Sequence, residues 1–137
     1  MQTTRTESAP VRTSGDVVSV RHLVRRWAVE LSFTIVEQTK IVTAASELAR
    51  NMIDYGGGGE LTLESLEDGG RKGLRLTFED QGPGIADINA ALRDGFTTGS
   101  GMGLGLGGSK RLSNEFDIRS APGEGTRVRI TRWKGAS

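Results

Sequence analysis

Two polar residues four positions apart, Glu47 and Asn51, are the first candidates for chemistry in this sequence. They lie in the stretch E-L-A-R-N, and in a helix both would point to one side with Cβ atoms about 5–6 Å apart. The amide oxygen of Asn51 could hold a hard cation while the carboxylate of Glu47 stays free to act as a base. Polar residues at this spacing most often form a solvated helix face. The pair therefore needs support from the rest of the chain.

A second candidate is Asp80, which ends an apolar, strand-like stretch and precedes Gly82, Pro83 and Gly84. An ionised carboxylate only accepts hydrogen bonds, so in a pocket it would select a ligand with a donor, such as the exocyclic amine of adenine. The glycines would let a flat base approach the backbone. The same D-x-G-P-G sequence is good turn chemistry, and from this segment alone a plain turn is the simpler interpretation.

The third candidate is the glycine-dense stretch Gly99–Gly108, followed by Ser109 and Lys110. It is not a Walker A loop, because serine rather than lysine follows the last glycine, and no strand precedes it as a dinucleotide-binding site requires. Glycines before a helix expose backbone N–H groups that can cradle phosphate oxygens, and Lys110 could add positive charge. A mobile linker is the alternative, and the leucines that continue into a helical pattern argue against it.

Composition limits the class of protein. The chain has 137 residues, 18 basic and 17 acidic, with no cysteine and one histidine. This length suits a single domain, and the near-neutral charge gives no indication of nucleic acid or a membrane as partner. Without cysteine there are no disulfides or thiolate metal sites. No apolar segment has the length of a signal peptide or a membrane span, so we expect a cytoplasmic protein.

Hydrophobic periodicity predicts an α+β domain. The polar, aperiodic segment 1–14 is expected to be a flexible arm. An amphipathic helix from Asp16 to about Leu31, capped by Ser14 or Asp16, carries arginines and His22 on a face that is most simply solvated. Further helices are predicted over 35–55, over 88–93, and from the glycines to about Glu115. Strands are predicted over 60–66, 74–78, 116–120 and 126–133, which favours a mixed, mostly antiparallel sheet covered on one face by helices.

Taken together in order, the strings E-L-A-R-N, D-Q-G-P-G, G-M-G-L-G-L-G-G and G-E-G-T resemble the N, G1 and G2 boxes and closing threonine of the GHKL superfamily. Members of that superfamily bind ATP with the Bergerat fold, a two-layer sandwich. The resemblance covers about residues 16–133 and implies one GHKL kinase domain over 15–134. The strings S-E-L-A-R-N, E-D-Q-G-P-G-I, D-G-F-T-T and K-R-L are most similar to the RsbT-type switch kinases of the stressosome.

The resemblance implies roles for individual residues. Glu47 would be the general base, Asn51 the magnesium ligand, Asp80 the adenine anchor and Thr126 a second contact to adenine. The residues that would line the base are Gly82, Gly84 and Ile85. Those that would contact the phosphates, beneath a lid over about 86–101, are Gly101, Met102, Gly103, Leu104, Gly105, Leu106, Gly107 and Lys110. ATP and Mg²⁺ are the implied cofactors.

The implied function is an ATP-dependent protein serine/threonine kinase that phosphorylates STAS-domain antagonists (RsbS- or RsbR-like) in partner switching during the stress response. A PP2C-type phosphatase (RsbU-like) or a sigma factor would be a further partner. The alternative is a nucleotide-gated anti-sigma module of the RsbW or SpoIIAB type without significant kinase turnover. A histidine-kinase catalytic domain is less favoured, because no acceptor histidine or dimerising helix hairpin precedes the site. The presence of Glu47 favours catalysis, since a pure binder has no need of a base beside the metal ligand.

Overall fold

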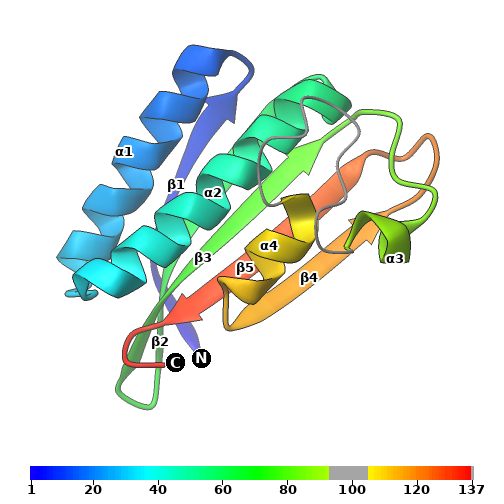
Figure 1. The fold of residues 1–137 in the computed structure, drawn as a ribbon. Coiled ribbons are helices and arrows are strands. Elements are labelled where there is room, and N and C mark those ends of the chain that lie inside the picture. Colours follow the sequence, from blue (N-terminus) through cyan, green and yellow to red (C-terminus); the bar gives the residue numbers. More distant parts are fainter. Residues whose placement is uncertain (93–104, 137) are drawn as a thin grey trace.

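The computed structural model describes residues 1–92 and 105–136. Within them the chain forms a five-stranded sheet with the strand order β1-β2-β3-β5-β4, and each neighbouring pair is antiparallel. Figure 1 shows the long helices α1 and α2 and the short helix α4 lying across the same face of this sheet. The predicted two-layer α+β architecture is confirmed.

The first ten residues correct the predicted flexible arm over 1–14. Gln2–Val11 form strand β1, which pairs with β2 over its whole length at one edge of the sheet. Its single fully buried residue is Val11. Its three threonines suit a pleated strand, but an edge strand exposed on both faces for most of its length has no hydrophobic alternation to detect.

Helix α1, Ser14–Glu30, begins with a capping box one residue earlier than predicted. The hydroxyl of Thr13 accepts from the backbone N–H of Asp16, and the Asp16 carboxylate accepts from the backbone N–H of Thr13. Asp16 is thus the reciprocal member of the box rather than the cap itself. The predicted apolar stripe of α1 is buried as expected, at Val17, Val20, Val24, Trp27 and Ala28.

Helix α2, Ile35–Gly56, is the longest element and crosses the middle of the sheet. A second capping box, between Thr34 and Glu37, starts the helix, and Gly57 ends it in the left-handed conformation with φ of 76°. The Glu37 carboxylate is buried and also accepts from the backbone N–H of Gly135 at 2.6 Å. The C-terminal end of the chain is therefore fastened to the start of α2.

The central hairpin consists of β2, Gly59–Asp68, and β3, Arg71–Asp80. Gly69 and Gly70 connect the two strands, and both have positive φ, as a two-residue hairpin turn requires. Leucines of these strands alternate inward beneath α2 and join a core that includes Ile41, Leu48 and Ile130. This burial, rather than any single polar contact, holds the helices on the sheet.

The C-terminal part contains α3, Ile88–Ala91, α4, Gly105–Arg111, β4, Glu115–Ser120, and β5, Thr126–Trp133. The helix predicted to reach about Glu115 ends four residues earlier. The reason is that Asn114 forms hydrogen bonds with β5 instead. Its side-chain Oδ1 accepts from the backbone N–H of Trp133, and its backbone N–H donates to the carbonyl oxygen of Thr131. These bonds draw the chain into the sheet before the helix can continue.

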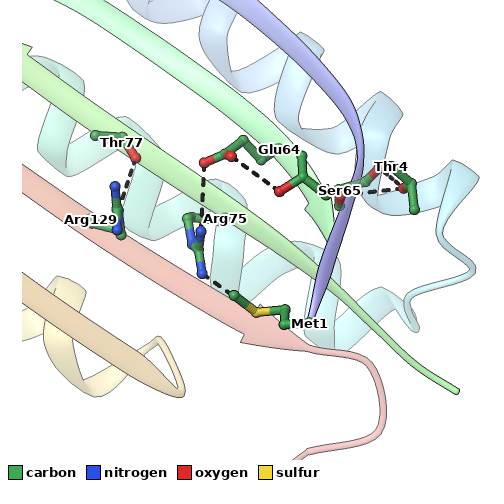
Figure 2. A network of polar contacts seen from close by, with 8 residues as sticks. Met1, Thr4, Glu64, Ser65, Arg75, Thr77 and Arg129 are labelled. Atoms are coloured by element: carbon green, nitrogen blue, oxygen red, sulfur yellow. Dashed lines mark hydrogen bonds and ion pairs between the residues drawn. The ribbon is translucent and has the colours of Figure 1, made fainter. Parts of the chain in front are cut away.

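Charged and polar side chains occupy the sheet face away from the helices. Figure 2 shows Arg75 beside Glu64, and Arg129 beside Thr77. The Arg75 guanidinium lies 3.9 Å from the Glu64 carboxylate, and Arg129 donates to the Thr77 hydroxyl at 3.4 Å. Burial, together with the guanidinium groups of Arg127 and Arg75, holds the pKa of Arg129 below its ordinary value. This face is mostly polar, with the buried side chains of Leu66 and Trp133 at one end, whereas the opposite face carries the main core.

Candidate functional site

The candidate site lies where one end of the sheet meets the C-terminal end of α2. There the strand register places Asp80 of β3 opposite Thr126 of β5, and Thr126 opposite Ser120 of β4. Directly paired residues share a face of an antiparallel sheet. All three side chains therefore belong to the helix-covered face, in one row across its end.

Asp80 is held in a defined orientation. It is only 9% exposed, and its Oδ1 accepts from the backbone N–H of Gly82 at 2.9 Å. Its Oδ2 makes no hydrogen bond within residues 1–92 and 105–136. One carboxylate oxygen is thus fixed by the backbone, and the other has no partner in the described residues. The role of adenine anchor stays a prediction for Asp80.

Glycines allow the segments around Asp80 to approach each other. A Cβ on Gly56, the last residue of α2, would overlap the Asp80 carboxylate, and a Cβ on Gly82 would lie 2.6 Å from the Cα of Gly56. Gly125, with φ of 75°, has no room for a Cβ because the backbone carbonyl of Asp80 occupies that space. A side chain at any of these positions would displace the carboxylate or its neighbours. Gly82 was predicted, whereas Gly56 and Gly125 were not.

Ser120 is a further residue of the site that the sequence patterns did not single out. Its hydroxyl accepts from the backbone N–H of Ile85 at 2.7 Å, donates to the carbonyl of Gly125 at 2.9 Å, and lies 2.8 Å from the Thr126 hydroxyl. Ile85 and Thr126, both predicted site residues, are thus brought together through it. The signal was present in the string S-A-P-G-E-G-T, whose hairpin turn pairs its first and last residues.

Glu47 and Asn51 lie side by side on α2, as predicted from their spacing. Both are half-buried, at the border between the core residues Leu48 and Met52 and solvent. In the described parts of the chain neither side chain has a hydrogen-bond partner. Asn51 precedes Gly56 by about 7.5 Å of helix rise and Glu47 by about 13.5 Å. A ligand with its base at Asp80 that extends back along α2 would pass Asn51 first and Glu47 second.

The predicted phosphate-binding residues are only partly described. Gly101, Met102, Gly103 and Leu104, and most of the predicted lid, lie outside the described residues. Gly105 begins α4, Leu106 and Gly107 are buried, and Lys110 is exposed in the last turn. Since α4 packs against α2, these residues lie beside the helix that carries Glu47 and Asn51.

A basic groove lies elsewhere, between α1 and α2. It has a volume of about 360 Å³ and is lined by Arg21, His22, Arg25, Arg26 and Val42. The arginines are exposed on α1, and Arg25 contacts the Gln38 amide oxygen at 3.3 Å. His22 therefore lies on a cationic surface and not in the site around Asp80. Within residues 1–92 and 105–136 no helix is long and apolar enough to cross a membrane.

Comparison with known proteins adds close relatives. The chain is 48% identical over 123 residues to the serine/threonine-protein kinase RsbT of Bacillus subtilis, covering 90% of this chain and 92% of the relative. It is 33% identical over 122 residues to an anti-sigma F factor of Thermoanaerobacter sp., covering 85% of this chain and 84% of that protein. The crystal structure of the RsbU and RsbW domains of a Mycobacterium tuberculosis protein matches 98% of this chain and 34% of that one, with a TM-score of 0.65 and 19% identity, and thus supports the fold alone.

The family model described as histidine kinase-, DNA gyrase B- and HSP90-like ATPase matches residues 36–135. This range contains Glu47, Asn51, Asp80, Ser120 and Thr126. The match extends over well more than half of the chain, and the chain therefore belongs to this family of ATPases.

Proposed function

We propose that the chain is an ATP-dependent protein serine/threonine kinase that acts in partner switching. The observation that carries the proposal is the pair Glu47 and Asn51, half-buried on α2 without partners in the described residues, on the helix whose end contacts Asp80. The 48% identity to a serine/threonine-protein kinase over nine-tenths of the chain supports the same activity. The cytoplasm is the proposed location of the reaction.

The nucleotide base is proposed to lie against Asp80. Its exocyclic amine would donate to the free Oδ2, because an ionised carboxylate offers no donor to a keto oxygen at that position. Gly82, Gly84, Ile85 and Thr126 would border the flat ring. A side chain at Gly82 or Gly84 would collide with the backbone of Gly56 or Ala121, so both glycines keep the segment after Asp80 closely packed. The phosphates would extend along α2 towards the glycines that precede α4, where the predicted contacts from Gly101 to Gly107 and Lys110 belong.

Asn51 fits the role of a magnesium ligand. Its amide is a neutral oxygen donor, half-buried and unpartnered in the described residues, next to a carboxylate. Magnesium suits few protein oxygens, with phosphate and water completing its shell, and when bound it would neutralise charge on the phosphates. Glu47, one helical turn away, would accept the proton of the attacking serine or threonine hydroxyl as that oxygen bonds to the terminal phosphorus. The bond from that phosphorus to the bridging oxygen would break, and ADP would leave with that oxygen.

The proposed protein substrates are STAS-domain antagonists, with a PP2C-type phosphatase or a sigma factor as further partner. Support comes from the relatives, one of them a kinase and others anti-sigma factors. The basic groove beside α1 is a surface where an acidic protein partner could bind, because its lining includes three arginines and no acidic residue.

The similarity to anti-sigma F factors favours one alternative, a nucleotide-gated module that sequesters its partner without significant turnover. Such a module would need Asp80 and Asn51 but not a base. Transfer chemistry that depends on Glu47 therefore separates the two functions.

The deciding experiment measures transfer of labelled phosphate from Mg-ATP to a co-encoded STAS-domain protein. Wild type, Glu47→Gln and a magnesium-free reaction run in parallel. Asp117→Asn is the control, because Asp117 is an exposed acid on the edge strand β4, on the sheet face away from the helices. Label on serine or threonine that requires Glu47 and magnesium supports the kinase. Tight ATP binding without transfer to any STAS-domain candidate supports the sequestering module.

A further inference from the structure

The hydroxyl of Ser120, on β4, contacts two other segments at the base end of the site, the loop after Asp80 and the start of β5. It contacts the backbone N–H of Ile85 after the Asp80 loop, the carbonyl of Gly125 before β5, and the hydroxyl of Thr126 at the start of β5. The distances are 2.7, 2.9 and 2.8 Å, all typical of good hydrogen bonds. A main-chain bond from the Gly123 N–H to the Pro83 carbonyl oxygen, at 2.7 Å, also joins the loop after Asp80 to the turn before β5, and the Ser120 side chain adds the contacts that reach Ile85 and the Thr126 hydroxyl.

Counting protons fixes the direction of each bond. A hydroxyl has one proton and two lone pairs. The Ile85 N–H can only donate to Ser120, and the Gly125 carbonyl can only accept from it. All three contacts are therefore satisfied together only if Thr126 donates its proton to Ser120. In that arrangement the Thr126 oxygen keeps both lone pairs for a ligand or a bridging water.

The same residues surround the subsite proposed for the base. Thr126 pairs across the strands with Asp80, and Gly125 contacts the backbone of Asp80 so closely that no Cβ fits. A shift of Ile85 or Thr126 would thus change the walls around the free Asp80 oxygen. A shift there would leave Glu47 and Asn51 on α2 undisturbed, because they belong to a different element.

We propose that Ser120 is a positioning residue for the base subsite: it locks the Thr126 hydroxyl and the Ile85 segment in the arrangement that receives adenine. This inference rests on the proposed function, because it takes the ligand at Asp80 to be an adenine nucleotide. Ser120 acts through Thr126 and Ile85 and need not touch the ligand itself.

The test compares nucleotide binding by wild type and Ser120→Ala. The dissociation constants of ATP and of adenosine are expected to rise by the same factor, about tenfold for loss of a shared hydrogen-bond centre. Binding of inorganic tripolyphosphate, which has no base, should be unchanged. In phosphate transfer, KM for ATP should rise with kcat preserved, and Ser120→Thr, which keeps the hydroxyl, should restore wild-type binding.

A second variant keeps the test decisive if Ser120→Ala folds poorly. Thr126→Val removes the partner hydroxyl but leaves the bonds from Ser120 to Ile85 and Gly125 intact. Adding Ser120→Ala to Thr126→Val should then cost less than the product of the two single effects, because both changes remove the same bond. Strictly multiplicative effects in a folded double variant contradict the inference.

The remaining outcomes of the binding test separate failure of this inference from failure of the proposed function. If Ser120→Ala weakens ATP but not adenosine, or lowers kcat instead of raising KM, the residue does not position the base and the inference is wrong. If wild type binds neither ATP nor adenosine, the proposed function fails, and the inference falls with it. If wild type binds both and Ser120→Ala binds them equally well, only the inference is overturned.

Discussion

The two ends of the candidate site are built differently. At the base end, Asp80, Gly82, Ile85, Ser120 and Thr126 are joined by short hydrogen bonds. Gly56 and Gly125 also leave no space for a Cβ at this end. Along α2, in contrast, the side chains of Glu47 and Asn51 make no hydrogen bond within the described residues. One end is organised before a ligand binds, and the other consists of two polar side chains on a helix that have no hydrogen-bond partner among residues 1–92 and 105–136.

This difference fits the roles that we propose for the two ends. Recognition of a flat base depends on acceptors whose positions are set in advance, since every group ordered on binding lowers affinity. A general base and a metal ligand face groups that arrive with the nucleotide and the protein substrate, and their hydrogen bonds often form only in the full complex. Substitutions at the base end should therefore change affinity, and substitutions on α2 should change the rate.

The largest expected effect is that of Glu47→Gln. Because the amide cannot accept the proton of the attacking hydroxyl, kcat for phosphate transfer should fall by about 10²–10⁴-fold, while ATP affinity stays close to wild type. Single-turnover transfer and calorimetric ATP titration give the two quantities. Asp117→Asn, a change at an exposed aspartate on the sheet face away from the helices, should leave both as they are. An unchanged rate of phosphate transfer in Glu47→Gln would show that Glu47 is not the general base.

The next effect is that of Asp80→Ala on nucleotide affinity. Loss of a hydrogen bond to a charged acceptor should weaken ATP binding by about 1.5–3 kcal/mol. Asp117→Ala is the matched control, because Asp117 is an exposed strand aspartate on β4. Titration calorimetry compares the three proteins. Equal ATP affinity in wild type and Asp80→Ala would show that Asp80 does not anchor the base.

Gly56→Ala examines the prearranged end without touching any polar group. Alanine favours a helix, but its Cβ would overlap the Asp80 carboxylate, which would have to move away from the Gly82 N–H. ATP affinity is therefore expected to fall by about tenfold in a protein that still folds cooperatively. Gly15→Ala is the control, because its Cβ would meet only the Thr13 hydroxyl at 3.6 Å. Wild-type ATP affinity in Gly56→Ala would mean that the position of the Asp80 carboxylate does not determine binding of the nucleotide.

Much of this comparison could be expected from the sequence, and some of it could not. The spacing of Glu47 and Asn51 determines their common face in any helix, and a strand that ends at Asp80 before glycines predicts an acceptor at a loop. The role of Ser120 depends on strand register, which brings it opposite Thr126 only after the hairpin forms. Gly56 looked like an ordinary helix end, because its contact with Asp80 joins elements 24 positions apart in the sequence.

The edge strand and the helix ends also could not be predicted from local sequence patterns alone. Residues 2–11 form β1 although their polarity favoured a flexible arm, since pairing with β2 supplies backbone bonds that no hydrophobic pattern announces. Thr13 rather than Ser14 or Asp16 caps α1, because neighbouring polar residues compete for one position and only backbone geometry selects between them. Local patterns predict elements, whereas contacts between elements decide their ends.

The smallest expected effect concerns the far end of α2 and serves as a contrast to both parts of the site. Burial raises the pKa of Glu37, but hydrogen bonds from Thr34 and Gly135 and the charge of Lys134 outweigh it, so the pKa lies below its ordinary value. A carboxyl with a lowered folded-state pKa contributes stability that is complete above its unfolded-state pKa, about 4.3, and is lost as the pH falls through the folded-state pKa. Glu37→Gln should therefore lower the free energy of unfolding near neutral pH by about 1–2 kcal/mol and flatten its decline in acid. Denaturant unfolding at a series of pH values measures both.

At neutral pH, ATP affinity and kcat should stay at wild-type values in Glu37→Gln, because neither end of the site contacts Glu37. An altered rate or affinity in this variant would mean that the start of α2 is coupled to the site along the helix.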